Sequence, residues 1–181
     1  MGYYRDSNML FPDGEGIARV LPRHIDHYML FVAGYSPQGA LMWASTIEES
    51  VIGKGIALGA EGEVILHGRL ERYRWDDAEP FSTSSIILGF DEGGDELWRE
   101  ELVSDPWGVN QAEEINSSEE GSYVITGKYS SSLTLAEGRE EETTLPPPDG
   151  LILQIYLARY DSDHSLLWAL GTGNVISGGT G

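Results

Sequence analysis

The stretch YDSDHSLLW, Tyr160–Trp168, occurs three times in variant form along this chain of 181 residues. The earlier copies are YSPQGALMW, Tyr35–Trp43, and FDEGGDELW, Phe90–Trp98. Each copy begins with an aromatic residue, passes through a polar turn and ends on a Trp. A spaced repeat of this kind is typical of an architecture in which one supersecondary unit is used several times.

Each copy predicts a β-hairpin. In the first copy, Phe31, Ala33 and Tyr35 alternate on one face of a strand, because successive side chains of a strand point to opposite faces. The segment 36–39, Ser-Pro-Gln-Gly, is a turn signal, since Pro sets φ and Gly accepts positive φ. Leu41 and the Trp that follows then begin the returning strand.

A second hairpin follows each of the first two copies. Glycines bracket its return strand, Gly62-Glu-Val-Ile-Leu-His-Gly68 in one case and Gly121-Ser-Tyr-Val-Ile-Thr-Gly127 in the other. We therefore divide the single domain, residues 1–181, into units of about 28–68, 84–127 and 151–173. The last unit holds only its first hairpin.

The sequence predicts an all-β fold with almost no helix, because no segment carries the apolar spacing of an amphipathic helix over two turns. Two hairpins per unit and one Trp at a fixed place are typical of β-propeller blades of four antiparallel strands. The expected architecture is a partial or composite propeller of two full units and a half unit.

Three segments of the chain resemble the bacterial repeat family known as SBBP, or seven-bladed β-propeller, repeats. They are Phe31-Val-Ala-Gly-Tyr35, Gly39-Ala-Leu-Met-Trp43 and Tyr156–Trp168. The stretch Gly127-Lys-Tyr-Ser-Ser-Ser-Leu-Thr-Leu135 is similar to the link between blades there. The resemblance implies a bacterial surface or exported protein that serves as a scaffold or a binding surface. It brings no shared catalytic residues.

An open array of blades leaves unpaired strand edges, which invite aggregation. Three arrangements would remove them. The chain is part of a longer propeller, or it self-associates into a composite ring, or the N-terminal segment 1–27 completes the last unit. The third alternative uses the strand expected at Gly16–Leu21.

Composition limits the partners. The chain has 30 acidic and 11 basic residues and a net charge of −19, which opposes binding to nucleic acid or to an anionic membrane surface. Cysteine is absent, so disulfides and thiolate metal sites are excluded. No apolar run reaches the roughly 20 residues that a membrane-spanning helix needs, so we expect no membrane insertion. The start of the chain lacks the pattern of a secretory signal.

Metal and sugar sites are not favoured. Asp161 and Asp163 resemble the start of a calcium loop, but the required later Gly and acid are missing. His24 and His27 lie three residues apart near a strand, where such residues point to opposite faces. The Trp of each repeat is expected in the core rather than at a sugar site, and all six repeated aromatic residues are assigned a structural role. These structural residues are Tyr35, Trp43, Phe90, Trp98, Tyr160 and Trp168.

One basic, aromatic loop is the best candidate for a ligand, which would be an anion or a glycan. It contains Arg69, Arg72, Tyr73, Arg74 and Trp75. The alternative is that its cations contact neighbouring acids such as Asp76, Asp77 and Glu79. Those three carboxylates also support a hydrolase or lyase hypothesis. Because no convergent catalytic set and no cofactor motif are visible, the leading hypothesis is a non-enzymatic scaffold or interaction module with a protein or glycan partner.

Overall fold

A computed structural model describes residues 1–4, 8–12, 17–22, 29–72, 82–105, 108–150 and 153–172. Within these ranges the fold is all-β, as the sequence predicts, with one 3₁₀ turn, η1, at Ala60–Gly62. The strands of the N-terminal half are β1 (Gly2–Tyr4), β2 (Met9–Pro12), β3 (Ile17–Leu21), β4 (Met29–Tyr35), β5 (Leu41–Ile47), β6 (Val51–Leu58), β7 (Val64–Arg72) and β8 (Ser82–Phe90). Those of the C-terminal half are β9 (Glu96–Ser104), β10 (Asn110–Ser117), β11 (Tyr123–Tyr129), β12 (Leu133–Leu135), β13 (Thr143–Leu145), β14 (Gln154–Tyr160) and β15 (Leu166–Gly171).

The five hairpins expected from the repeat are present. The antiparallel pairs are β4–β5, β6–β7, β8–β9, β10–β11 and β14–β15. All three copies of the quoted repeat form a strand, a tight turn and a return strand. The local sequence pattern therefore predicts the local structure correctly, because alternation and turn residues act over a few positions only.

The described strands form four antiparallel sheets, and none of them closes into a barrel. The six-stranded sheet has the order β13-β12-β9-β8-β7-β6, and the four-stranded sheet has the order β10-β11-β14-β15. A three-stranded sheet has the order β1-β4-β5, and β2 pairs with β3. Each large sheet joins the second hairpin of one sequence unit to the first hairpin of the next, through β7–β8 and β11–β14.

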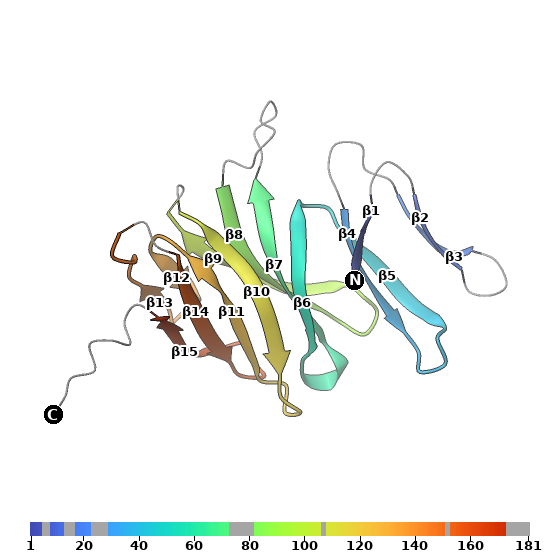
Figure 1. Cartoon of the computed structure of the whole chain (residues 1–181). Coiled ribbons are helices and arrows are strands. Elements are labelled where there is room, and N and C mark those ends of the chain that lie inside the picture. The colour runs from blue at the N-terminus through green and yellow to red at the C-terminus, as the bar shows by residue number, and fades with distance from the viewer. Residues whose placement is uncertain are drawn as a thin grey trace.

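The sheets lie face to face in a row, with an apolar cluster between each pair of neighbours (Figure 1). Leu66 of β7 packs towards Leu30 of β4, whereas the preceding residue, Ile65, packs towards Ile125 of β11. The six-stranded sheet is thus apolar on both faces, because it lies between two other layers. Phe11 of β2 belongs to the cluster on the outer face of β4 and β5.

The N-terminal segment lies at one end of this row and the four-stranded sheet at the other (Figure 1). Because β1 pairs with β4 and β2 pairs with β3, the described part of residues 1–27 adds to the first hairpin. It makes no strand pair with β14 or β15, the strands of the last sequence unit.

The stretch between the second and third sequence units contains two further strands, β12 and β13. Leu133 and Leu135 of β12 are fully buried, and Leu145 of β13 is nearly so. Their alternation with Thr is a strand signal that the acidic and proline-rich surroundings obscure. The two strands extend the six-stranded sheet beyond β9. The described part of the chain has no helix of a length and apolarity that could cross a membrane.

Candidate functional site

The first turn of each repeat has the same backbone. The first amide of the turn donates to the fifth carbonyl, from Ser36 to Ala40 at 2.8 Å, from Asp91 to Asp95 at 3.0 Å and from Asp161 to Ser165 at 3.0 Å. The fourth residue has positive φ in every copy, 82° at Gly39, 84° at Gly94 and 63° at His164. A non-glycine residue in this region is uncommon, so His164 marks the third turn as different.

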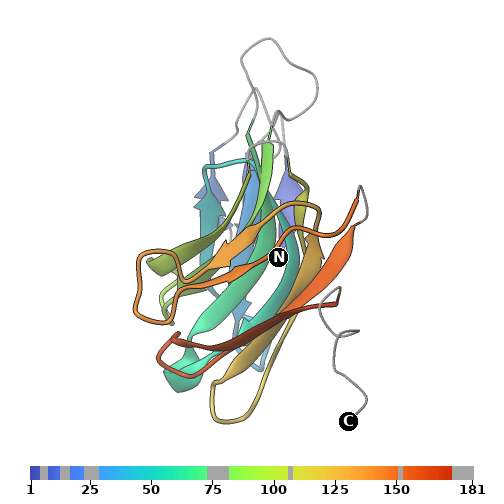
Figure 2. The same ribbon diagram turned by 90° about the vertical axis from the view of Figure 1, so that its left-hand side faces the viewer.

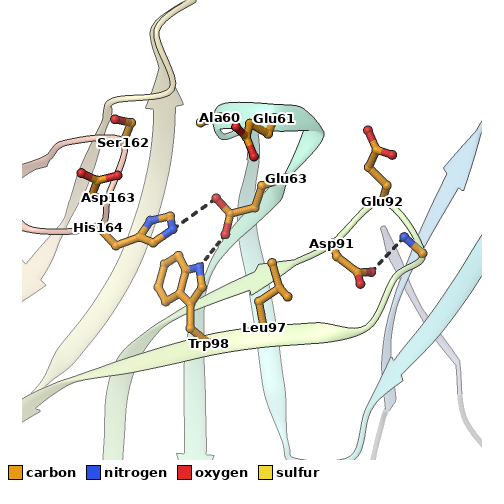
Figure 3. A pocket seen from close by; sticks show the side chains of 11 residues that line it. Ala60, Glu61, Glu63, Asp91, Glu92, Leu97, Trp98, Ser162, Asp163 and His164 are labelled. Carbon is orange, nitrogen blue, oxygen red and sulfur yellow. Dashed lines mark hydrogen bonds and ion pairs between the residues drawn. The ribbon is translucent and has the colours of Figure 1, made fainter.

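A cleft of about 720 Å³ opens where the third turn meets the six-stranded sheet (Figure 3). Its walls come from η1 and the start of β7, from the β8–β9 turn and β9, and from the β14–β15 turn. The lining residues are Ala60, Glu61, Glu63, Asp91, Glu92, Gly93, Leu97, Trp98, Ser162, Asp163 and His164. Since five of them are acids and none is Lys or Arg, the cleft favours a cation over an anion.

Glu63 is the centre of the contacts inside this cleft (Figure 3). It is only 8% exposed, and one carboxylate oxygen accepts a hydrogen bond from the indole N–H of Trp98. The other oxygen lies 3.3 Å from Nε2 of His164, whose ring centroid is 4.1 Å from that of the indole. The carboxylate therefore links a residue of β9 to the turn of the next sheet.

Close backbone approach makes this arrangement possible. Trp98 lies across from Gly89 on β8, and a Cβ on that glycine would overlap both the indole and the Glu63 carboxylate. In the first repeat, Gly34 lies across from Trp43 in the same way. In the first two copies a Gly therefore precedes the aromatic residue, and it allows the indole to approach the backbone closely.

Behind the cleft, a second carboxylate is buried between the sheets. Glu100 accepts hydrogen bonds from the Tyr160 hydroxyl at 2.7 Å and from the Ala136 amide at 3.0 Å, and Arg139 lies 3.0 Å from its other oxygen. Burial and the Glu100 charge raise the pKa of Tyr160 well above its usual range. Tyr160 also stacks on Tyr123 at a centroid distance of 5.1 Å. This network ties β9, β12 and β14 together.

A third buried polar group lies further along the same interface. Nδ1 of His67 is 3.0 Å from the Glu114 carbonyl and donates to it, while Nε2 is 3.4 Å from the Tyr156 hydroxyl. Burial lowers the pKa of His67 to about 4, so the ring is neutral at pH 7. Tyr156 donates to Ser85, which in turn donates to Asn110. All of these groups join neighbouring sheets, which is a structural role.

The structure places the six repeat aromatics in two environments. Phe90 and Tyr160 are 2% and 0% exposed, and Trp43 and Trp98 pack against the clusters on either side of the six-stranded sheet. Tyr35 is 55% exposed and Trp168 is 40% exposed. These two lie in the layers that have no repeat hairpin beyond them. Of the three Trp residues expected in the core, Trp43 and Trp98 pack against these clusters, whereas Trp168 is 40% exposed on the outer face of the four-stranded sheet.

Strands β14 and β15 run side by side in Figure 2, and within the described residues their outer face is apolar and exposed. We call it the tail face. Ile155, Leu157, Trp168 and Leu170 on it are 46%, 38%, 40% and 54% exposed. Arg159 lies beside Trp168 at the position where the earlier copies have Gly34 and Gly89.

Two residues of the predicted anion- or glycan-binding loop are engaged with acids. Arg69 pairs with Glu71, and Arg72 pairs with Glu101 through both guanidinium nitrogens and also donates to Ser84 at 3.0 Å. The acids differ from the ones expected, since Glu71 and Glu101 come from the sheet itself. The other residues of this prediction lie outside the described residues; they are Tyr73, Arg74, Trp75, Asp76, Asp77 and Glu79. The same is true of His24 and His27.

Sequence reasoning missed Glu63, Glu100 and His164. The turn position of His164 was visible, but its contact with Trp98 depends on the packing of two sheets. Within the described ranges, no group of three or more His, Asp or Glu residues is arranged to hold a metal ion. No protein-family model matches the chain, and no curated protein matches it.

Proposed function

We propose that this chain is a non-enzymatic repeat module of the β-propeller type that acts as a scaffold or interaction domain. The observation that carries the proposal is the tail face, an apolar sheet surface that the described part of the chain leaves exposed. Contiguous exposed apolar surface marks interaction sites in soluble proteins. The buried carboxylates and the buried histidine serve sheet contacts instead.

Support for the propeller-type arrangement comes from the two large sheets. Strands β6 to β9 form an up-and-down run of four antiparallel strands, and so do β10, β11, β14 and β15. The two runs pack face to face around one apolar cluster. A blade of a β-propeller is likewise a four-stranded antiparallel sheet. The further step to a bacterial surface or exported protein follows from the SBBP resemblance alone.

The test separates an interaction face from a folding core. Leu157→Glu combined with Leu170→Glu places two charges on the tail face. We expect the urea midpoint to change by less than the equivalent of about 1 kcal/mol, since exposed positions tolerate polar residues. Binding of the neutral dye Nile red should fall in this variant. The matched control is Leu58→Glu, at a 65% exposed position on β6, which should leave dye binding unchanged.

Cooperative unfolding lost in the double variant would show that the tail face belongs to the core, and the proposal would fail. Equal dye binding by the double variant and the wild type would also count against it, because the dye would then bind elsewhere.

A further inference from the structure

The two internal contacts between repeats use the same pair of elements. Trp43 lies against Gly94, the fourth residue of the next turn, whose carbonyl accepts a hydrogen bond from Ser45. Trp98 lies against His164, the fourth residue of the turn after that. In each case the Trp of one repeat is covered by the first turn of the following repeat.

Each end of the chain keeps one half of this contact. In the part of the chain that the structure describes, no later turn covers Trp168, and it is 40% exposed. The turn 36–40, which we call the head turn, has no preceding Trp. The space around Gly39 is open, since a Cβ added there would meet no atom within 4 Å. Tyr35 beside it is 55% exposed, whereas its equivalents Phe90 and Tyr160 are at most 2% exposed.

The equivalence extends to the neighbouring positions. Two residues before Gly34 is Val32, two before Gly89 is Ile87, and two before Arg159 is Leu157. The first two are 1% and 0% exposed, but Leu157 is 38% exposed. An apolar side chain is kept at all three places, although only two are covered within the chain. Val32 and Ile87 are each covered by the neighbouring sheet, which contains the next copy of the repeat.

We propose that a second copy of this chain covers the tail face, with its head turn seated on Trp168 as Gly94 is seated on Trp43. This inference rests on the proposed function, because it names the partner of the tail face. The β2–β3 hairpin covers part of the outer face of β4 and β5 and leaves the head turn accessible, as Figure 1 shows.

Charge is compatible with this contact. The head turn, Ser-Pro-Gln-Gly-Ala, carries no charge, and Arg159 is the charged residue beside Trp168. The net charge of −19 makes two copies repel at long range, and salt screens that repulsion. Association should therefore strengthen as the salt concentration rises. A head-to-tail contact gives a ring if its rotation closes and a filament if it does not.

The experiment is sedimentation velocity of the full chain over a range of protein and salt concentrations. We expect concentration-dependent association of the wild type. Trp168→Glu on the tail face and Tyr35→Glu beside the head turn should each raise the dissociation constant at least about tenfold, as truncation of an aromatic anchor does. Leu58→Glu adds the same charge at an exposed position outside both surfaces, and it should leave the constant unchanged.

Mixing the variants tests the head-to-tail geometry. Tyr35→Glu retains an intact tail face, and Trp168→Glu retains an intact head turn, so one productive contact remains possible between them. The mixture should therefore form a heterodimer, although each variant alone stays monomeric. Leu170→Glu is the alternative tail-face variant if Trp168→Glu fails to fold, and it should behave in the same way.

A wild-type chain that remains monomeric at millimolar concentration and high salt would overturn the proposal. So would association that Tyr35→Glu does not weaken, or a mixture that shows no heterodimer. The proposed function fails separately, through lost folding or unchanged dye binding in the tail-face double variant. A stable monomer with an accessible tail face would leave that function in place and remove only the second copy as the partner.

Discussion

The faces around Trp98 and Trp168 come from the same repeat, yet one is covered and the other is bare. Around Trp98, the next turn adds His164 and Glu63 adds a carboxylate, so the indole is held from two sides. Around Trp168, the described residues add no further layer, and Arg159 replaces the glycine. Burial of a repeat position is therefore decided by its place in the row of sheets, as in other arrays of nearest-neighbour contacts.

The largest expected difference is between Ile87 and Leu157, which occupy equivalent positions on the two faces. Ile87→Ala should cost about 2–5 kcal/mol of unfolding free energy, because it leaves a cavity between two sheets. Leu157→Ala should cost less than about 1 kcal/mol, since its side chain is partly in water already. Urea unfolding of the two variants makes the comparison. Equal costs would show that the tail face is buried.

Acid should weaken the covered interface through His67. The folded-state pKa is about 4 and the model-peptide value is 6.5. Below pH 6.5 the unfolded chain takes up a proton that the folded chain refuses, so stability falls as the pH drops from 6.5 to about 4. The lowering of the His67 pKa from 6.5 to about 4 corresponds to a loss of about 3 kcal/mol of unfolding free energy.

The measurement for His67 is the urea midpoint of the wild type and His67→Gln between pH 7 and pH 4. Gln keeps an N–H donor for the Glu114 carbonyl but does not titrate. The stability difference between the two proteins should shrink by about 3 kcal/mol over this range. Parallel pH profiles would contradict the neutral, buried ring.

The Glu63 carboxylate should contribute to the covered face through its acceptor oxygens. Glu63→Ala leaves the Trp98 N–H without its partner, and we expect a loss of about 1–3 kcal/mol. Glu63→Gln keeps one acceptor and should lose less. Glu92→Ala on the exposed rim of the same cleft is the control and should be nearly neutral. Tryptophan emission and urea unfolding report the outcome, and similar effects of Glu63→Ala and Glu92→Ala would argue against a contribution of the Glu63 carboxylate to this face.

The smallest expected effect on stability is at Arg159, which occupies on the tail face the position that Gly89 occupies on the covered face. Gly89→Ala forces a Cβ into Trp98 and should cost about 1–3 kcal/mol through overpacking. At the equivalent third position, Arg159→Ala should stay within about 0.5 kcal/mol of the wild type. Thermal unfolding compares the two. A large loss at Arg159 would mean that the third repeat packs like the second.

Much of the fold was predictable from the sequence because hairpins are local. Alternation and turn chemistry around Tyr35, Phe90 and Tyr160 predicted all three repeat hairpins. The grouping of hairpins into sheets was not predictable from the sequence. The pairing of β7 with β8 joins strands on either side of residues 73–81 and depends on which faces are buried. The strands β12 and β13 were missed because each offers only a short alternation beside acidic and proline-rich residues.

The candidate site was less predictable than the fold. Trp98 was recognised as a core residue, but its carboxylate partner Glu63 lies 35 residues away and carries no motif. The exposure of Trp168 could not be read from its own stretch, because that stretch is the same repeat that is buried elsewhere.

The most direct test compares Trp98 and Trp168 in one sample. The chain is labelled with 5-fluorotryptophan, and Trp98→Phe and Trp168→Phe assign the two fluorine resonances. In dilute solution a soluble nitroxide should broaden the Trp168 resonance much more than the Trp98 resonance. At high protein concentration the Trp168 resonance should become protected while that of Trp98 stays unchanged. Equal broadening of both resonances at every concentration would contradict the claim that one repeat position is covered and the other is bare.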